Sequence, residues 1–149
     1  MNLLAQRVLS SSLYIEKKKI VSIDRGILAL VGFEKGDTSS DCEIIADKLL
    51  NYRIFPDDKG RMENSVIDIK GDLLLVPEVT LALETRRGTR PSFSEAASPD
   101  LGKILLDELS NKLREIHDKL EVGIFGADME INIINDGPVT FLFKSTDFK

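Results

Sequence analysis

A short segment in the middle of the chain combines a backbone interruption with groups that can stabilise negative charge. It reads Val76-Pro77-Glu78-Val79-Thr80-Leu81 and ends an apolar run of strand-like composition. A threonine hydroxyl, or a backbone N–H turned outward after the proline, can donate a hydrogen bond to an oxyanion. The same residues also suit an ordinary strand with Pro77 at an edge or a bulge, and composition alone favours that plain strand. The segment is therefore a candidate site with a structural alternative.

A second segment, Asn135-Asp136-Gly137-Pro138-Val139-Thr140, lies between two apolar runs near the carboxyl end. Asp-Gly between such runs is a strong hairpin signal, so we expect a β-hairpin that joins a strand over 130–135 to one over 139–143. A hairpin does not explain Pro138 at the start of the outgoing strand. A cis peptide after Gly137 would expose backbone carbonyl groups in a fixed direction, which makes this turn the second candidate site.

The usual side-chain machinery of catalysis is missing from the sequence. It contains no GxSxG, GxxxxGK[ST], GxGxxG or HExxH pattern. The single histidine, His117, falls among charged residues near the end of a predicted helix, where we expect a solvated side chain and no catalytic role. The single cysteine, Cys42, has no disulfide partner and is expected in the core. One histidine and one cysteine argue against a soft-ligand metal centre, and no cofactor is predicted.

Most of the elements that must position these segments are strands. The runs over 3–9, 13–15 and 20–23 predict three short strands, separated by Ser10-Ser11-Ser12 and by a solvated turn at Lys17-Lys18-Lys19. A phosphate contact is the less favoured interpretation of those lysines. The apolar run over 27–33 has the length of a strand buried on both faces, so it should be central. Further strands are predicted over 65–69 and 73–76.

Two helices are predicted between the strands. Ser40 and Glu43 have the spacing of a capping box that opens the first helix. The second begins at 98–100 with an N-cap serine, a proline and an aspartate. The polar stretch 84–98 before it is a long loop, a kind of segment that often carries function. The apolar stripes of the two helices are Cys42, Ile45, Ala46, Leu49 and Leu50, and then Leu101, Leu105, Leu109, Ile116 and Leu120.

Length and composition predict one soluble domain over 1–149. Of its 149 residues, 42% are hydrophobic and 30% charged, which is typical of a globular chain of α+β class given this order of elements. No apolar run reaches the ~18 residues of a membrane span, and the first residues lack the layout of a secretory signal, so we expect a cytoplasmic protein. The net charge of -5 disfavours broad phosphate neutralisation but permits recognition of a nucleic-acid end in one pocket.

Five segments, in order, resemble those of the D-aminoacyl-tRNA deacylases. Residues 135–140 reproduce the motif NxGPVT, and residues 6–8, 52–55, 90–94 and 125–129 match further segments, so the resemblance covers nearly the whole chain. It implies a β-rich, barrel-like single domain with two helices packed on the sheet. It also implies a cytoplasmic homodimer that serves translation quality control and needs no membrane.

The activity that the resemblance implies is hydrolysis of the ester between a D-amino acid, or glycine, and the tRNA 3′ end. Gly137 and Pro138 would form a chiral selector, a cis peptide whose carbonyls hold the substrate α-amino group in the partner subunit's site. The Val79 N–H would stabilise the reacting carbonyl. The other residues given a role are Glu78 and Thr80 in catalysis, Pro77, Val139 and Thr140 in substrate binding, Arg7 in holding the selector, and Phe125 and Met129 in lining an adenine pocket.

If the resemblance holds, basic residues in the long loop are candidates for contacts with tRNA. Arg86, Arg87 and Arg90 would meet tRNA phosphates, although loop arginines are just as often merely solvated.

Two positions depart from the family's usual SQxTL motif. Pro77 replaces the serine and removes a backbone donor, and Glu78 replaces the glutamine and adds a charge beside the ester. A sister family that removes L-alanine from mischarged threonine tRNA has PQATL here, yet it carries GPYT where this chain has Val139. The intact selector motif favours the D-specific activity. The alternatives are the L-alanyl-tRNA activity and a non-catalytic binder of aminoacyl-tRNA.

Overall fold

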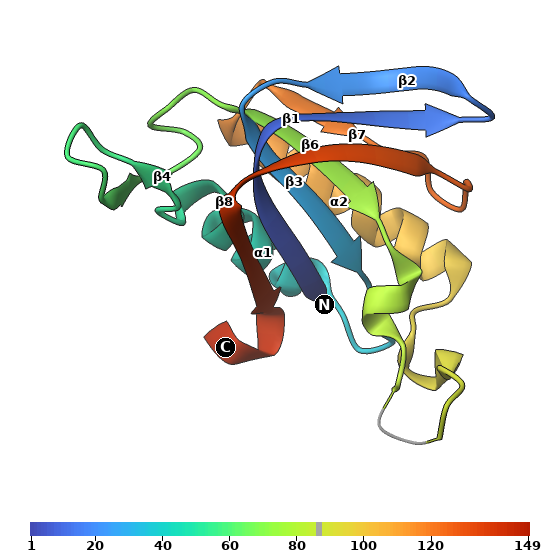
Figure 1. Ribbon diagram of the computed structural model, residues 1–149. Coiled ribbons are helices and arrows are strands. Elements are labelled where there is room, and N and C mark those ends of the chain that lie inside the picture. Colours follow the sequence, from blue (N-terminus) through green and yellow to red (C-terminus); the bar gives the residue numbers. More distant parts are fainter. Residues whose placement is uncertain (86–87) are drawn as a thin grey trace.

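A curved mixed sheet packs against two helices in the computed structural model, which describes residues 1–85 and 88–149 (Figure 1). The strands are β1 (Asn2–Ile15), β2 (Lys18–Ile23), β3 (Gly26–Gly32), β4 (Phe55–Pro56), β5 (Met62–Asn64), β6 (Asp72–Pro77), β7 (Leu120–Val122) and β8 (Glu130–Lys144). The helices are α1 (Ser39–Asn51) and α2 (Pro99–Ile116), with short 3₁₀ turns η1 (Val79–Ala82), η2 (Phe93–Glu95) and η3 (Ser145–Phe148).

The sheet has the order β2-β1-β3-β6-β7, and β8 pairs along almost the whole of β1. Strands β1 and β3 are antiparallel, whereas β3, β6 and β7 are parallel neighbours. Because β2 returns toward β6 and β7, the sheet is nearly closed as a barrel. The small β4–β5 ribbon projects from the body (Figure 1). The predicted α+β class, with two helices on a β-rich barrel-like sheet, is confirmed.

The core has two parts, one on each face of the sheet. Ile27 and Leu73 face a cluster shared with both helices, in which Cys42 is fully buried as predicted. Leu28 and Leu74 belong to a second cluster on the opposite face. Strand β3 is thus buried on both faces and central, which explains its unbroken apolar run.

The first helix starts earlier than its predicted capping box. Thr38 is the N-cap of α1, and the carboxylate of Asp41 accepts hydrogen bonds of 2.9 Å from both the N–H and the hydroxyl of Thr38. The prediction at Ser40 and Glu43 is wrong, because Glu43 points outward to Lys112 instead. The buried Asp41 satisfies the helix end that Glu43 leaves open.

The end of the second helix also differs from the prediction. The N-cap at Ser98 is confirmed, since its hydroxyl accepts from the N–H of Leu101. The apolar stripe, however, does not reach Ile116, which is exposed, and Leu120 belongs to β7. His117 is buried rather than solvated, because its Nε2 lies 2.7 Å from the carbonyl oxygen of Gly71.

Two predictions about strands are wrong, each for its own reason. Residues 10–12 form no loop: β1 continues through them, and the buried Ser11 donates to the carbonyl of Asn132 at 3.1 Å. Residues 65–69 form turns instead of a strand, because the carboxylate of Asp68 accepts from the Ser65 N–H at 2.7 Å. Pairing with β2 and β8 keeps residues 10–12 extended, whereas local side-chain hydrogen bonds favour the turn after Ser65. The lysine turn is confirmed only at Lys17: the turn between β1 and β2 is Glu16-Lys17, and Lys18 and Lys19 already pair with β1 as the start of β2.

Candidate active site

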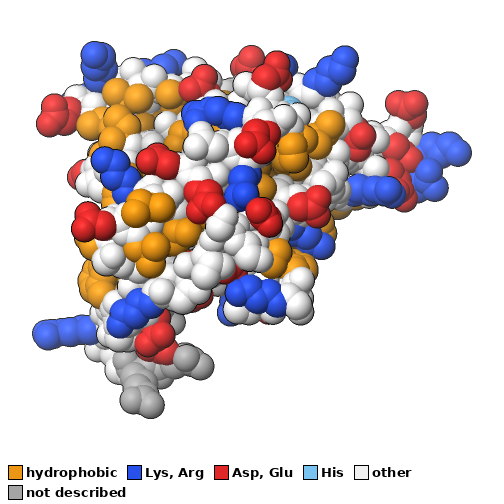
Figure 2. All heavy atoms as spheres, turned by 180° about the vertical axis from the view of Figure 1, so that it is seen from behind, with side chains coloured by type: hydrophobic (Ala, Val, Ile, Leu, Met, Phe, Trp, Pro, Cys, Tyr) orange, Lys and Arg blue, Asp and Glu red, His pale blue; other side chains and the backbone are white. Residues whose placement is uncertain are grey.

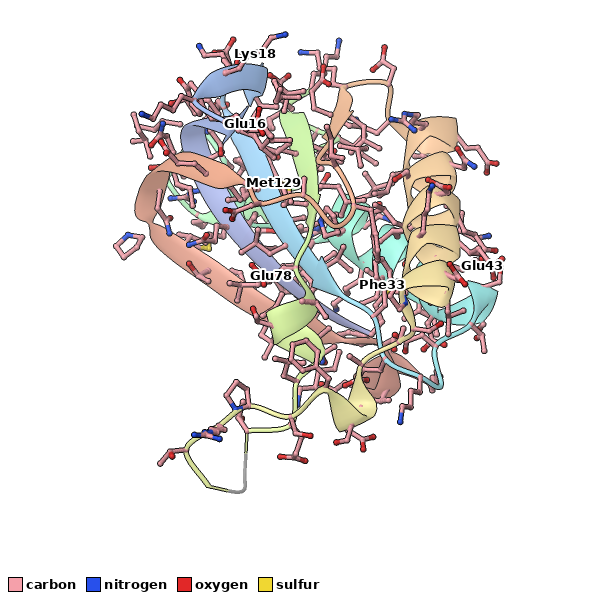
Figure 3. The ribbon with its side chains drawn as sticks, turned by 90° about the vertical axis from the view of Figure 1, so that its right-hand side faces the viewer. Glu16, Lys18, Phe33, Glu43, Glu78 and Met129 are labelled. Atoms are coloured by element: carbon pink, nitrogen blue, oxygen red, sulfur yellow. The ribbon has the colours of Figure 1, made fainter. Side chains whose placement is uncertain are left out.

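A cleft of about 700 Å³ opens where the end of β6 meets the loop before α2 and the loop between β7 and β8. Pro77, Glu78 and Val79 line it from one side, and Phe125 and Met129 line it from the other. Glu78 and Met129 lie on the same side of the molecule (Figure 3). The structure therefore brings the candidate catalytic segment together with the two residues expected to line an adenine pocket.

The turn after β6 has a local cause in its sequence. The N–H of Glu78 donates to the carbonyl of Val31 at 2.8 Å, which continues the pairing of β6 with β3. The Glu78 side chain then caps η1, because its Oε1 accepts from the N–H of Thr80 at 3.2 Å and from the Thr80 hydroxyl. Both donors of Thr80 are thus engaged. The hydrogen bonds of the described residues leave the N–H of the half-exposed Val79 without an acceptor.

One residue that lines the cleft and one that lies behind it were not singled out from the sequence. Phe93 is 65% exposed and lines the third side of the cleft, and an aromatic residue in a polar loop is the signal that could have found it. Gly102 lies behind Phe125: a Cβ on this glycine would be 3.0 Å from the ring Cζ. A glycine inside a helix costs about 1 kcal/mol relative to alanine, so it often marks a close approach of this kind.

The Gly137-Pro138 segment lies in a bulge within one long strand. Gln6 pairs with Thr140 and Val8 pairs with Asn135, so that residues 136–139 bulge out opposite the intervening residue of β1. The predicted hairpin is wrong, because both halves of β8 pair with β1 and not with each other. The Gly137-Pro138 peptide is cis.

Arg7 anchors this bulge from beneath. Its guanidinium is almost fully buried, and Nη1 donates to the carbonyl of Ile54 at 2.6 Å. Its Nε donates to the carbonyl of Asp136 at 3.2 Å and lies 3.0 Å from the Asp136 carboxylate. Arg7 thus contacts Asp136, the residue before Gly137, and its role in holding a selector stays a prediction. Gly137 and Pro138 themselves are exposed.

The residues after the bulge are held by Asn135. Its Oδ1 accepts from the N–H of Val139 at 3.1 Å, and its Nδ2 donates to the hydroxyl of Thr140 at 3.2 Å. Val139 is buried and part of the core, whereas Thr140 is exposed. These contacts fix where the exposed Gly137-Pro138 segment projects.

The bulge does not reach the cleft of its own chain. Ile131 lines the cleft and pairs with Leu13, whereas the bulge lies opposite Arg7. Arg7 and Leu13 are six positions apart on β1, so the bulge lies about 20 Å from Ile131 at strand spacing. Gly137 and Pro138 do not line the cleft within the described part of the chain.

The loop arginines are only partly described. Arg90 is exposed on the loop, while Arg86 and Arg87 lie outside the described residues. Over residues 1–85 and 88–149 no cluster of His, Cys, Asp and Glu could hold a metal ion. None of the helices in those ranges is long and apolar enough to span a membrane.

Comparison with known proteins places this architecture in a family. The family model described as D-Tyr-tRNA(Tyr) deacylase matches residues 4–144. The chain is 50% identical over 145 residues to a D-aminoacyl-tRNA deacylase of Teredinibacter turnerae, covering 97% of this chain and 100% of that protein. It is 47% identical to a protein of the same name from Francisella tularensis subsp. tularensis, covering 93% of this chain and 96% of that protein.

Two solved structures share the fold. A structure titled c-Myc DNA Unwinding Element Binding Protein matches with a TM-score of 0.93 and 32% identity, over 97% of this chain and 98% of that chain. A probable eukaryotic D-amino acid tRNA deacylase matches with a TM-score of 0.84 at 17% identity, over 95% and 97%, which shows the shared fold. On the family match and the close relatives together, this chain belongs to the D-Tyr-tRNA(Tyr) deacylase family.

Proposed function

We propose that this protein is a D-aminoacyl-tRNA deacylase, which hydrolyses the ester between a D-amino acid and the 3′-terminal adenosine of tRNA. The supporting observation is the cleft, in which the Pro77–Val79 turn faces Phe125 and Met129. Apolar walls of this kind suit a nucleoside, and the turn supplies a polar group for the ester.

The chemistry needs a water molecule and a stabilised oxyanion. Water attacks the ester carbonyl carbon, the bond to the ribose oxygen breaks, and the products are the free amino acid and the tRNA hydroxyl. The unengaged N–H of Val79 is the proposed oxyanion donor, and one such donor contributes about 100- to 1,000-fold to the rate. Glu78 acts as a positioning residue, because its carboxylate holds both donors of Thr80 and fixes the turn.

Chiral selection is proposed to occur between two copies of the chain. The Gly137-Pro138 segment is exposed and lies about 20 Å along β1 from Ile131 of its own cleft, which supports insertion into the cleft of a partner. Exposed apolar side chains beside it, Ile133, Ile134 and Leu142 on β8 and Leu9 on β1, supply a surface for that homodimer. The selector carbonyls would hold the substrate α-amino group, and an L side chain would collide with them.

Contacts with the body of the tRNA are proposed at the long loop. Arg90 is exposed there, and Arg86 and Arg87 share the segment. An enzyme that acts on aminoacyl-tRNA is expected where translation takes place, so we include a cytoplasmic location in the proposal.

The direct test compares D-Tyr-tRNA with L-Tyr-tRNA at the same enzyme concentration. We expect hydrolysis of the D-ester and retention of the L-ester. Equal hydrolysis of both, or of neither, would contradict the proposal. Preferential hydrolysis of L-alanyl-tRNA charged on the threonine acceptor would instead assign the sister activity.

Selection across subunits has its own test, a mixture of two inactive variants. Phe125→Ala damages the cleft and Gly137→Ala damages the selector, and each is assayed alone as the control. After the two are denatured and refolded together, half of the dimers are mixed and each carries one intact pairing of cleft and selector, so about a quarter of the wild-type activity should return. No gain in the mixture, or a monomer by sedimentation, contradicts selection in the partner subunit.

A further inference from the structure

The cleft itself is unsuited to phosphate. Over the described residues that line it, the charged side chains are Glu78 and Asp128, both acidic, and no lysine or arginine is present. A phosphodiester placed there would be repelled. If the terminal nucleoside occupies the cleft, the phosphates of the preceding nucleotides must be bound outside it.

A basic segment lies just beyond one rim of the cleft, with Lys17 in the turn after β1 and Lys18 and Lys19 at the start of β2. Met129 lines the cleft, and the next residue, Glu130, pairs with Tyr14 of β1. Lys17 follows three residues later, about 10 Å away at strand spacing. Figure 3 shows Lys18, Glu16, Met129 and Glu78 one below another on the same side of the molecule.

The lysines of this segment are available to an external anion. Lys17, Lys18 and Lys19 are all exposed, and none has a carboxylate partner within 4.0 Å among the residues that the structure describes. Lys19 has only a cation–π contact with the Tyr14 ring, at 6.0 Å. The nearby acids, Glu16 and Glu130, leave the segment with a net positive charge.

The sequence contains no second run of three adjacent lysine or arginine residues. On the opposite side from the view of Figure 1, acidic and basic side chains are interspersed (Figure 2). The chain as a whole carries a net charge of -5. A run of three adjacent lysines beside the cleft is therefore a local feature that the fold alone does not require.

We propose that Lys17, Lys18 and Lys19 form a subsite for the phosphates of the single-stranded polynucleotide that leads into the cleft. The inference rests on the proposed function, in which the terminal adenosine of a tRNA lies against Phe125 and Met129. The segment then contributes binding energy outside the reacting centre, so it acts on substrate affinity and leaves the chemical step unchanged.

The experiment compares Lys17→Gln/Lys18→Gln/Lys19→Gln with wild type on D-Tyr-tRNA over a range of salt. On a single strand, each neutralised phosphate adds about 0.7 to the slope of log KM against log salt concentration. Loss of one such contact therefore lowers this slope by about 0.7. If the contact contributes nothing at 1 M salt, its loss raises KM at 0.1 M salt up to about 5-fold. We therefore expect KM to rise by about 10- to 100-fold with kcat unchanged, and the slope to fall by about 2 for the triple variant. D-Tyr-adenosine, which has no phosphate, should be hydrolysed equally by both proteins.

Two variants serve as matched controls. Lys59→Gln removes the same kind of charge from another exposed turn and should leave KM and the salt slope as in wild type. The triple Lys→Arg variant retains the charge and should retain the slope. An unchanged KM and slope in the triple Gln variant overturns the inference while the proposed function stands.

A binding measurement separates the two hypotheses. A labelled single-stranded RNA ending in CCA is titrated with each protein at several salt concentrations. If the wild type hydrolyses neither ester, the proposed function falls, but weaker RNA binding by the triple Gln variant would still support the phosphate subsite. Equal binding by wild type and variant would reject it.

Discussion

Removing the side chain of Arg7 tests whether the exposed bulge depends on one buried guanidinium. In Arg7→Ala the carbonyl of Ile54 is deprived of its 2.6 Å hydrogen bond, and Asp136 is deprived of the guanidinium that lies 3.0 Å from its carboxylate and 3.2 Å from its carbonyl. Arg7 is only 8% exposed, so water does not simply replace it. The bulge should lose both stability and its fixed direction.

The size of the effect follows from these hydrogen bonds. Hydrogen bonds that involve a charged group contribute about 1.5–3 kcal/mol each. The Asp136 side chain is 28% exposed and can be hydrated again, so its ion pair adds little to the loss. The two hydrogen bonds to carbonyl groups therefore predict a loss of about 3 kcal/mol or more in the free energy of unfolding. For a chain of this size that corresponds to a fall in Tm of about 6–12 °C.

Urea unfolding and the hydrolysis of D- and L-Tyr-tRNA are measured on the same preparations. Arg53→Ala is the control, since it removes an exposed ion pair to Glu63 and should cost less than about 1 kcal/mol. We expect Arg7→Ala alone to lower D-ester hydrolysis and the D-over-L preference. Stability within about 1 kcal/mol of wild type, with an unchanged preference, would refute the role assigned to Arg7.

Three further predictions concern backbone, thiol and carboxylate. Gly137 has a φ of +129°, and a Cβ there would be 2.7 Å from Val139 Cγ2, so Gly137→Ala should cost about 2 kcal/mol in urea unfolding; a cost near zero contradicts this. Burial, followed by the charge of Glu108, raises the pKa of the Cys42 thiol to about 12, so iodoacetamide should label it at pH 8 only after denaturation, as checked by mass spectrometry. Burial alone would raise the pKa of Asp41, but hydrogen bonds led by that from Lys149 outweigh it and hold the pKa far below the usual range. Its contribution is fully present above about pH 4 and is lost as the pH falls toward the lowered pKa, so the stability gap between wild type and Lys149→Gln should be constant down to about pH 4 and narrow from there to pH 2; a gap that stays constant to pH 2 argues against it.

The sequence predicted the fold best where a pattern is local. The apolar run of β3, the Ser98 cap of α2 and the stripe around Cys42 each depend on neighbouring residues, and all are confirmed. His117 was mispredicted because its partner, the Gly71 carbonyl, is 46 residues away in the chain. The charged residues next to His117 in the sequence do not indicate a contact with a distant carbonyl group.

For the candidate site too, the sequence predicted local segments but not their arrangement in space. The sequence identified the Pro77–Val79 turn and the Gly137-Pro138 segment, but it could not show that the turn ends β6 whereas the segment bulges from β8 on the far side of β1. The Asp-Gly pair suggested a hairpin, because the signal cannot report that β1 is long enough to pair with both flanking runs. Gly102 was missed because its role depends on the Phe125 ring, which arrives from another loop.

The bulge opposite Arg7 also affects solubility. In the part of the chain that the structure describes, β8 pairs only with β1, so its outer side offers unpaired amides along 15 residues that include the exposed Ile133 and Ile134. A long, straight, apolar edge strand of this kind can pair edge to edge with the same strand of another molecule and so promote aggregation. Residues 136–139 interrupt it and leave two short lengths out of line with each other. The bulge that exposes Pro138 to solvent thus also prevents continuous strand pairing between neighbouring molecules.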